Sequence, residues 1–340
     1  MPASSYPFIW HVAMRLAIDE AWRYQLLTYP NPAVGACVLD AHGAPIAVAA
    51  HRQAGGPHAE VRAIRDAYVA LSGDRTIAAC EESDMLHDYL KERAGKLFSG
   101  HTIVVTLEPC AHHGRTPACA DLIGDLGFER VVIGTMDPNP VAAGGAARLR
   151  RRGIEVVTGI EKRGCEELLS PFEEWSREGR LVVFKLAQSL NGVIGGGTIS
   201  CESSRRWVHR LRTRIDWLVV GGETVRVDRP KLDSRLVGGK APDVAILTRR
   251  PDSIDRSIPL FEMPDRRVDF VQSLPPRGLV MVEGGGGTLE ALRRQIDWMV
   301  LFVAPFVKEG IGYNGTKDFR LMHQRRVGRD AMLWLKAKHG

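Results

Sequence analysis

The chain has 340 residues, of which 44% are hydrophobic and 25% are charged, a composition typical of a soluble globular protein. A typical single domain is about half this length, so we expect two domains. No apolar run approaches the roughly 20 residues that span a bilayer, and the N-terminal segment lacks the basic and apolar regions of a signal peptide. We therefore expect a cytoplasmic protein with no membrane partner.

The net charge of +6 raises the question of nucleic-acid binding. Lys and Arg are, however, spread along the chain, and the most basic stretches, 149–152 and 205–214, are predicted to be faces of ordinary helices. The chain has no basic tail and no interleaving of aromatic with basic residues. A phosphorylated small substrate and a phosphorylated cofactor would explain the positive charge equally well, and we expect no nucleic-acid partner.

The first half of the chain alternates between helix and strand. Periodicity predicts helices over 7–25, 59–71, 118–126 and 142–152, and strands over 34–39, 46–51, 102–107, 130–135 and 154–158. The polar segment 72–100 interrupts the alternation and has helical periodicity over 83–97, as an inserted surface helix would. Alternation of this kind predicts a three-layer α/β domain.

Three residues of this half are the expected ligands of a zinc ion: His58, Cys110 and Cys119. One imidazole and two thiolates leave a fourth position open for water, whose pKa zinc lowers to roughly 7. Glu60 stands two residues after His58 and could move protons without ligating the metal. His-x-Glu, Pro-Cys and a later Cys are typical of zinc nucleobase deaminases, although residues 111–118 here replace the usual Cys-x-x-Cys spacing. We expect a catalytic zinc site.

The second half is predicted to be another α/β unit. Strands are expected over 181–187, 217–220, 244–248, 268–271, 279–282 and 299–306, and helices over 203–214 and 288–295. The Gly-x-Gly-x-x-Gly fingerprint of a Rossmann site is absent, but Glu283 precedes four glycines between a strand and a helix. Such glycines would let a phosphate approach backbone N–H groups; the alternative is a flexible loop that binds nothing.

The first 160 residues resemble the deaminase domain of the bifunctional riboflavin-biosynthesis deaminase/reductase family. The segments that carry the resemblance are 30–35 (PNPAVG), 57–61 (PHAEV), 106–119 (TLEPCAHHGRTPAC) and 137–140 (DPNP). The long cysteine loop is the specific feature, because tRNA-adenosine, cytidine and deoxycytidylate deaminases generally keep Cys-x-x-Cys. The resemblance continues through 185–192, 222–230 and 283–285, and so covers nearly the whole chain.

This resemblance implies an N-terminal cytidine-deaminase-like three-layer α/β/α domain and a C-terminal dihydrofolate-reductase-like α/β domain. The expected limits are 1–160 for the zinc-dependent pyrimidine deaminase, 161–180 for a charged linker helix and 181–340 for the NADPH-dependent reductase. The first domain would release ammonia from 2,5-diamino-6-ribosylamino-4(3H)-pyrimidinone 5′-phosphate. The second would reduce the ribosyl group to ribityl with NADPH. The family also favours a homo-oligomer.

The resemblance further implies the roles of individual residues. In the deaminase the substrate would contact Asn31, His51, His112, Arg115 and Thr116. In the reductase the substrate or cofactor would contact Lys185, Thr224, Asp228, Arg235, Glu283, Gly284 and Gly285. Lys185 also stands out by itself, because a single charge in an apolar strand is costly to bury and is better placed in a cleft.

The reductase half departs from the family pattern at three places. Asn191 replaces an aspartate, the short segment 195–200 replaces a Gly-Glu-Ser-x-Trp stretch, and Arg229 replaces an acidic residue beside Asp228. One alternative is therefore a deaminase whose second domain binds but does not reduce. Another is a nucleic-acid base deaminase with an appended binding domain, which the positive charge permits and the long cysteine loop opposes.

Overall fold

The computed structural model describes residues 7–112, 114, 116–312 and 317–338. The chain divides into two compact units, Met1–Phe172 and Glu173–Gly340. The division falls within helix α6 (Lys162–Glu178), beside Pro171, the proline inside that helix. None of the helices in the described ranges has the length and apolar character needed to cross a membrane.

The first unit contains a five-stranded sheet in the order β2-β1-β3-β4-β5. Its strands are β1 (Gly35–Leu39), β2 (Pro45–Ala50), β3 (Thr102–Leu107), β4 (Arg130–Thr135) and β5 (Glu155–Thr158). β1 pairs antiparallel with β2 and β3, whereas β3, β4 and β5 are parallel. The strands predicted for this half of the chain are confirmed.

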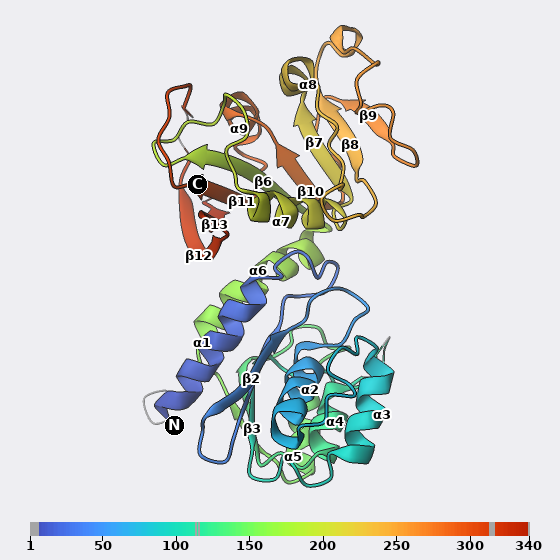
Figure 1. The fold of residues 1–340 in the computed structure, drawn as a ribbon, viewed down its shortest axis with the longest axis vertical. Coiled ribbons are helices and arrows are strands. Elements are labelled where there is room, and N and C mark those ends of the chain that lie inside the picture. The colour runs from blue at the N-terminus through green and yellow to red at the C-terminus, as the bar shows by residue number, and fades with distance from the viewer. Residues whose placement is uncertain (1–6, 113, 115, 313–316, 339–340) are drawn as a thin grey trace. The chain divides into compact units, whose positions relative to one another are not determined.

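Helices cover both faces of this sheet (Figure 1). Besides α6, they are α1 (Phe8–Trp22), α2 (Ala59–Ser72), α3 (Ser83–Arg93), α4 (Cys119–Asp125) and α5 (Gly145–Arg151). Successive strand residues point to opposite faces, so Ala36 and Val38 of β1 join a core with α2 to α5. Gly35 faces the other way, and a Cβ there would lie 2.0 Å from the carbonyl oxygen of Ala17 in α1. The predicted three-layer α/β/α architecture is confirmed.

The inserted segment 72–100 is more than a surface helix. It contains the predicted helix as α3, but Leu86, Leu90 and Phe98 are fully buried and belong to the main core of the unit. The ring of Phe98 stacks on Phe128 at a centroid distance of 4.8 Å. The segment therefore adds to the hydrophobic core, which its overall polarity conceals in the sequence.

The second unit is built on an eight-stranded sheet in the order β12-β13-β11-β6-β10-β7-β8-β9. The parallel strands are β6 (Arg180–Ser189), β7 (Trp217–Gly221), β8 (Asp243–Leu247), β9 (Val268–Val271), β10 (Gly278–Glu283) and β11 (Trp298–Ala304). The helices are α7 (Glu202–Arg212), α8 (Gly222–Asp228) and α9 (Gly286–Leu292), with a 3₁₀ turn at Pro251–Ser253. Because these strands are parallel, their carboxyl ends share one edge of the sheet, where ligands bind in α/β folds.

Besides the short 3₁₀ turn, the second unit has three elements outside the predicted set: α8 and the antiparallel hairpin of β12 (Phe319–Val327) and β13 (Asp330–Ala337). Trp334 of β13 is fully buried and its ring contacts Trp298 and Trp207. β12 is rich in Arg and only its last residue, Val327, is buried, so it shows little of the alternation that marks a strand. Its pairing with β13, rather than its own pattern, makes it a strand.

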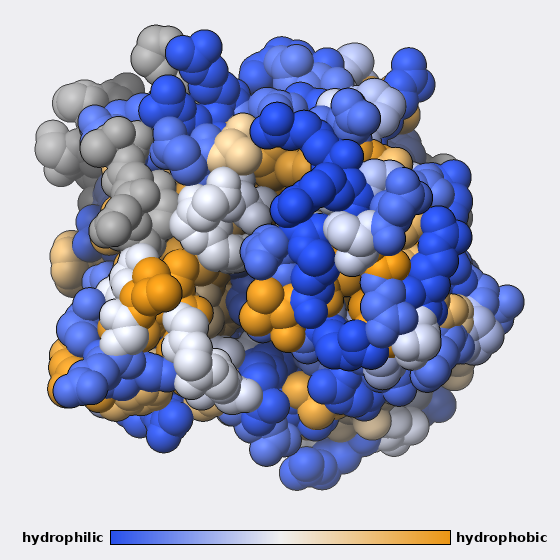
Figure 2. All heavy atoms as spheres, turned by 90° about the horizontal axis from the view of Figure 1, so that it is seen from above, coloured by the Kyte–Doolittle hydropathy of each residue, from blue (hydrophilic) through white to orange (hydrophobic). Residues whose placement is uncertain are grey.

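The surface seen in Figure 2 is mostly hydrophilic, with apolar side chains in separate patches. Exposed apolar residues of the second unit include Leu190, Val307 and Ile311. Leu190 donates its backbone N–H to the Phe306 carbonyl at 2.8 Å, so the turns after β6 and β11 lie side by side. Apolar groups spread in this way are ordinary for a protein surface.

We predict that His87→Met stabilises the protein. His87 of α3 is 1% exposed, and neither ring nitrogen has a hydrogen-bond partner among the described residues. Burial lowers the pKa of His87 from 6.5 to about 4. Below pH 6.5 the unfolded chain therefore takes up a proton that the folded protein does not, and wild-type stability falls as the pH drops toward 4.

Urea unfolding at pH 7.5 and pH 5.5 tests this prediction. Removing two unsatisfied buried nitrogens should raise the free energy of unfolding by about 1–3 kcal/mol, and the gain should be larger at pH 5.5. The exposed His42 gives the matched control, His42→Gln, which should change neither value. Equal stability of His87→Met and the wild type at both pH values would show that the ring is satisfied in solution.

Candidate functional site

His58, Cys110 and Cys119 come together in the first unit. The Nδ1 atom of His58 lies 3.6 Å from the Sγ atom of Cys110 and 3.4 Å from that of Cys119. Their ligand atoms all lie within 4.8 Å of one another, and no other group of this kind occurs among the described residues. The three residues predicted to bind one metal ion thus form a single cluster.

Local structure explains how segments far apart in sequence reach this cluster. His58 is the N-cap residue of α2, and Cys119 is the first residue of α4. Cys110 lies in the loop after β3. It is fixed there because its carbonyl oxygen accepts the Ala120 N–H at 3.2 Å and its Sγ atom accepts the Cys119 N–H at 3.3 Å.

The donor set fits zinc. The hydrogen bond from Cys119, resisted by burial, lowers the pKa of the Cys110 thiol well below its ordinary value and so favours its thiolate form. The close thiolate holds the pKa of Cys119 above its ordinary value, and a cation between the sulfurs would remove that repulsion. One imidazole and two sulfurs are a common zinc set that leaves one position open.

Glu60 is in the first turn of α2 and is only 3% exposed. Burial raises the pKa of its carboxyl group to about 7. The group also lies close enough to Cys119 to accept a hydrogen bond from its thiol. Glu60 is therefore a buried acid beside the cysteines, in the place expected for a group that moves protons.

Three of the expected substrate residues surround the cluster. The ring of His51 packs edge-on against that of His58, with the ring centroids 5.4 Å apart. The Nε2 atom of His51 lies 3.3 Å from the Nδ2 atom of Asn31. Thr116 Oγ1 lies 3.4 Å from His58 Nε2. His112 is exposed in the loop between the cysteines, while Arg115 lies outside the described residues.

Glu108 was not among the expected site residues, yet it holds the cysteine loop in place. Its buried carboxylate accepts backbone N–H groups of Asp137, Gly144 and Ala146 at 3.3, 3.1 and 2.9 Å. It thereby joins the strand end before Cys110 to the start of α5. The available signal was a carboxylate directly before Pro-Cys, just after a strand with no charged residue.

The second candidate site lies at the carboxyl edge of the sheet in the other unit. Lys185 of β6 is opposite Glu283, the last residue of β10, in the parallel pairing of these strands. Burial lowers the pKa of Lys185, while the charge of Glu283 opposes that effect. Lys185 is only partly buried, in keeping with its expected position in a cleft.

Arg212 is the main residue that the sequence did not identify. Its helix was predicted to present a solvated basic face, but Arg212 is 9% exposed and its guanidinium binds both oxygens of Glu283, with contacts of 2.8 to 3.1 Å. Although burial would raise the pKa of Glu283, Arg212 and Lys185 hold it below its ordinary value. The prediction failed here because helical periodicity alone does not show which basic residue faces a carboxylate.

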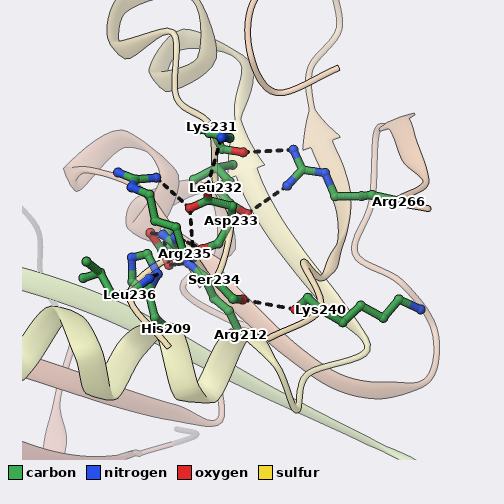
Figure 3. A network of polar contacts seen from close by, with 11 residues as sticks. His209, Arg212, Lys231, Leu232, Asp233, Ser234, Arg235, Leu236, Lys240 and Arg266 are labelled. Carbon is green, nitrogen blue, oxygen red and sulfur yellow. Dashed lines mark hydrogen bonds and ion pairs between the residues drawn. The ribbon is translucent and has the colours of Figure 1, made fainter. Parts of the chain in front are cut away.

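Arg235 and Arg212 both reach the segment around Asp233 (Figure 3). Arg212 Nη1 donates to the Asp233 carbonyl at 2.9 Å, and Arg235 Nη1 binds the Asp233 carboxylate at 2.6 Å. Arg235 remains 60% exposed, as a residue that binds a phosphate from solution would be. Thr224 and Asp228 both lie on α8, where Asp228 is exposed at the last position.

The glycines at this edge permit close packing of the turns. A Cβ at Gly221 or Gly284 would come within 2.8 or 2.7 Å of the Thr288 Oγ1 atom. Gly285 is the N-cap residue of α9, and a Cβ at Gly287 would meet nothing within 4 Å. The turn thus leaves open backbone at the start of α9, which fits the phosphate of a dinucleotide cofactor.

One of the departures from the family pattern has a local explanation. Asn191 Oδ1 accepts from the Ser189 hydroxyl at 2.7 Å and the Lys308 N–H at 3.2 Å, while its Nδ2 donates to the Lys308 carbonyl at 2.9 Å. An aspartate could not make that last bond. Lys308 in turn donates to the carbonyls of Gly195 and Gly196, so the short segment is tied down from one side.

Comparison with protein families matches the two units separately. Residues 10–135 match the cytidine and deoxycytidylate deaminase zinc-binding region, and residues 180–263 match the RibD C-terminal domain. The first match contains all three clustered ligands, and the second contains Lys185, Arg212 and Arg235.

Individual relatives give the same assignment. The chain is 36% identical over 232 residues to the riboflavin biosynthesis protein RibD of Synechocystis, a match of 66% of this chain and 55% of that protein, so it spans about half the length of this relative. It is 31% identical to RibD of Mycobacterium tuberculosis, covering 88% of this chain and 86% of that one. A Thermotoga maritima crystal structure, titled as a diaminohydroxyphosphoribosylaminopyrimidine deaminase/5-amino-6-(5-phosphoribosylamino)uracil reductase, aligns with a TM-score of 0.65 and 27% identity over 97% of this chain and 99% of that one. The chain therefore belongs to the RibD family of riboflavin biosynthesis proteins.

Proposed function

We propose that this protein is a bifunctional enzyme of riboflavin biosynthesis. The first activity is hydrolytic deamination of 2,5-diamino-6-ribosylamino-4(3H)-pyrimidinone 5′-phosphate, and the second is NADPH-dependent reduction of its ribosyl group to ribityl. The observation that carries the proposal is the cluster of His58, Cys110 and Cys119 with the buried Glu60 beside it. A site of this composition in a chain of this family supports deamination of a pyrimidine rather than of a nucleic acid.

The deaminase residues have distinct tasks. His58, Cys110 and Cys119 would hold zinc, which when bound supplies a Lewis acid that activates water. Glu60 is suited to take a proton from water and deliver protons to the ring nitrogen and the leaving amine, because it is a buried carboxyl group beside the ligand cluster and is not itself part of that cluster. Asn31 and His51 would orient the pyrimidine, while Thr116 and Arg115 would bind its polar groups from the cysteine loop.

The reductase residues work by charge and position. NADPH supplies the reducing equivalents when bound. Lys185 would donate a hydrogen bond to the sugar, and Glu283, held in place by Arg212, keeps a compensating negative charge beside it. Arg235 would bind the substrate phosphate, and Gly284 and Gly285 would admit the cofactor phosphate. Thr224 and Asp228 of α8 would contact the substrate or the cofactor.

Several further assignments belong to the same proposal. The deaminase domain would comprise 1–160, the linker helix 161–180 and the reductase domain 181–340. The partners would be the phosphorylated pyrimidine and a second copy of the chain in a homo-oligomer, with no nucleic acid or membrane. The enzyme would act in the cytoplasm.

We predict about one zinc ion per chain, and loss of most of it in Cys110→Ser. A serine hydroxyl is a much weaker ligand than a thiolate, whereas Cys80→Ser should keep full zinc content because Cys80 is outside the cluster. Elemental analysis of the purified proteins gives the answer. A wild-type protein that is fully metal-free and releases ammonia would rule out the zinc site.

Glu60→Gln is expected to keep its zinc and lose deamination. Glutamine preserves the shape of the side chain but cannot carry a proton, and general acid–base catalysis is typically worth about 10²–10⁴-fold in rate. Ammonia release and zinc content should be measured on the same preparation. Turnover within a few-fold of wild type would place the proton shuttle on another residue.

Lys185→Ala is predicted to slow NADPH oxidation by about 10²-fold or more and to leave ammonia release close to wild type. Glu60→Gln, supplied directly with the deaminated intermediate, should show the reverse pattern. If Lys185 were structural, its removal would lower thermal stability and both activities together. Absence of NADPH oxidation in the wild type would instead indicate a second unit that binds without reducing.

A further inference from the structure

Arg62 connects the deaminase centre to the inserted segment 72–100. It follows His58 by one turn of α2, and its backbone N–H bonds the His58 carbonyl at 3.1 Å. Its side chain is 1% exposed, yet it carries a permanent positive charge. Nη1 lies 2.9 Å from Oε1 of Glu81, and Nη2 contacts the other oxygen of the same carboxylate. A two-pronged pair of this kind fixes the orientation of the guanidinium.

The Nε donor of Arg62 bonds the backbone next to the ligand His58. Its Nε atom donates to the Pro57 carbonyl at 3.2 Å, and that carbonyl is also 3.1 Å from Nδ1 of His51. Because a carbonyl can only accept, Nδ1 of His51 carries the proton and Nε2 is left to accept from Asn31. The Pro57 carbonyl thus sets the tautomer of His51, and Pro57 directly precedes the ligand His58.

Glu81 is the anion on which this arrangement depends. Arg65, 4% exposed, donates to the Cys80 carbonyl at 2.8 Å and lies 3.4 Å from Glu81, so two buried guanidinium groups converge on one carboxylate. The Glu81 side chain is 47% exposed and also lies 4.0 Å from the half-exposed Arg52, so solvent reaches the carboxylate but neither Arg62 nor Arg65. Without Glu81, Arg62 would be a buried charge without a counterion. Its side chain would have to move, and its hydrogen bond to the Pro57 carbonyl would be lost.

We propose that the inserted segment is part of the deaminase machinery: Glu81 positions Arg62, which through the Pro57 carbonyl orients His51 and the metal ligand His58. Glu81 and Arg62 are positioning residues and touch neither substrate nor metal. The inference rests on the proposed deaminase function for its kinetic consequences, but its geometric claim concerns the ligand His58 directly. If the pair of Arg62 with Glu81 only held the inserted segment against the core, the bond from Arg62 to the Pro57 carbonyl would not be needed.

The test compares Glu81→Gln with Glu82→Gln in the full-length zinc protein. The two changes remove the same charge at neighbouring positions, and Glu82 is exposed with no ion pair among the described residues. The rate of zinc release to an excess of a coloured chelator is measured first, followed by kcat and KM for ammonia release. Loss of a residue that orients a metal ligand typically costs about 10–100-fold in metal affinity or activity.

Glu81→Gln should therefore release zinc about tenfold faster than wild type and show a lower kcat/KM, while Glu82→Gln behaves as wild type. If zinc release and kcat/KM of Glu81→Gln equal those of the wild type, the proposal is wrong, even if the variant has a lower Tm. The inserted segment would then only contribute to stability. If Glu81→Gln does not fold, Glu81→Asp keeps the charge but is too short to hold both Arg62 nitrogens in place. Its zinc release should then be faster than wild type, and an unchanged rate would count against the proposal.

Failure of the proposed function would look different. A wild-type protein without zinc or ammonia release would contradict the deaminase assignment itself. A zinc-loaded, active wild type whose Glu81→Gln variant matches it in both measurements would contradict only the role of the inserted segment.

Discussion

The first unit depends on keeping two sulfurs and an imidazole within 4.8 Å of one another. Such a cluster is costly, because Cys110 and Cys119 repel each other once both are ionised. The backbone limits the cost by donating to Cys110 from the start of α4, and Glu108 fixes the strand end from the opposite side. Close packing completes the arrangement: a Cβ at Gly145 would lie 1.8 Å from the Pro109 carbonyl oxygen, so only glycine lets α5 approach the loop this closely.

The second unit also brings charged side chains close together, and there a carboxylate shared between two basic residues stabilises them. Parallel pairing of β6 with β10 brings Lys185 opposite Glu283, and both oxygens of the Glu283 carboxylate also bind Arg212. A lysine with a fully committed partner could not bind a ligand, whereas one with no negative charge nearby would lose its proton on burial. The shared carboxylate avoids both outcomes, and it explains why a buried arginine lies in a helix whose other basic residues are mostly solvated.

The sequence was sufficient for most of the fold and for the metal cluster, because both rest on local signals. Strands such as β3 and β4 are apolar and β-branched, and the ligand residues have few alternative uses in that spacing. Arg212, Glu108 and Arg62 escaped prediction since each acts through a partner 19 to 71 residues away, and a single sequence does not show such pairings. β12 was missed for the same reason: its pairing with β13 makes it a strand, and its own pattern is weak.

Glu60 shows how burial and metal chemistry have to be balanced. In the protein alone, burial raises the pKa of this carboxyl group to about 7, which favours the protonated form below neutral pH. A divalent cation at the neighbouring ligands would act in the opposite direction, because it stabilises the carboxylate. A group that must first accept a proton and then give it up works best when neither form is strongly preferred. In a solvated position the same cation would act on a carboxyl group whose pKa already lies well below neutral, so burial of Glu60 favours the balance that the proposed proton transfer needs.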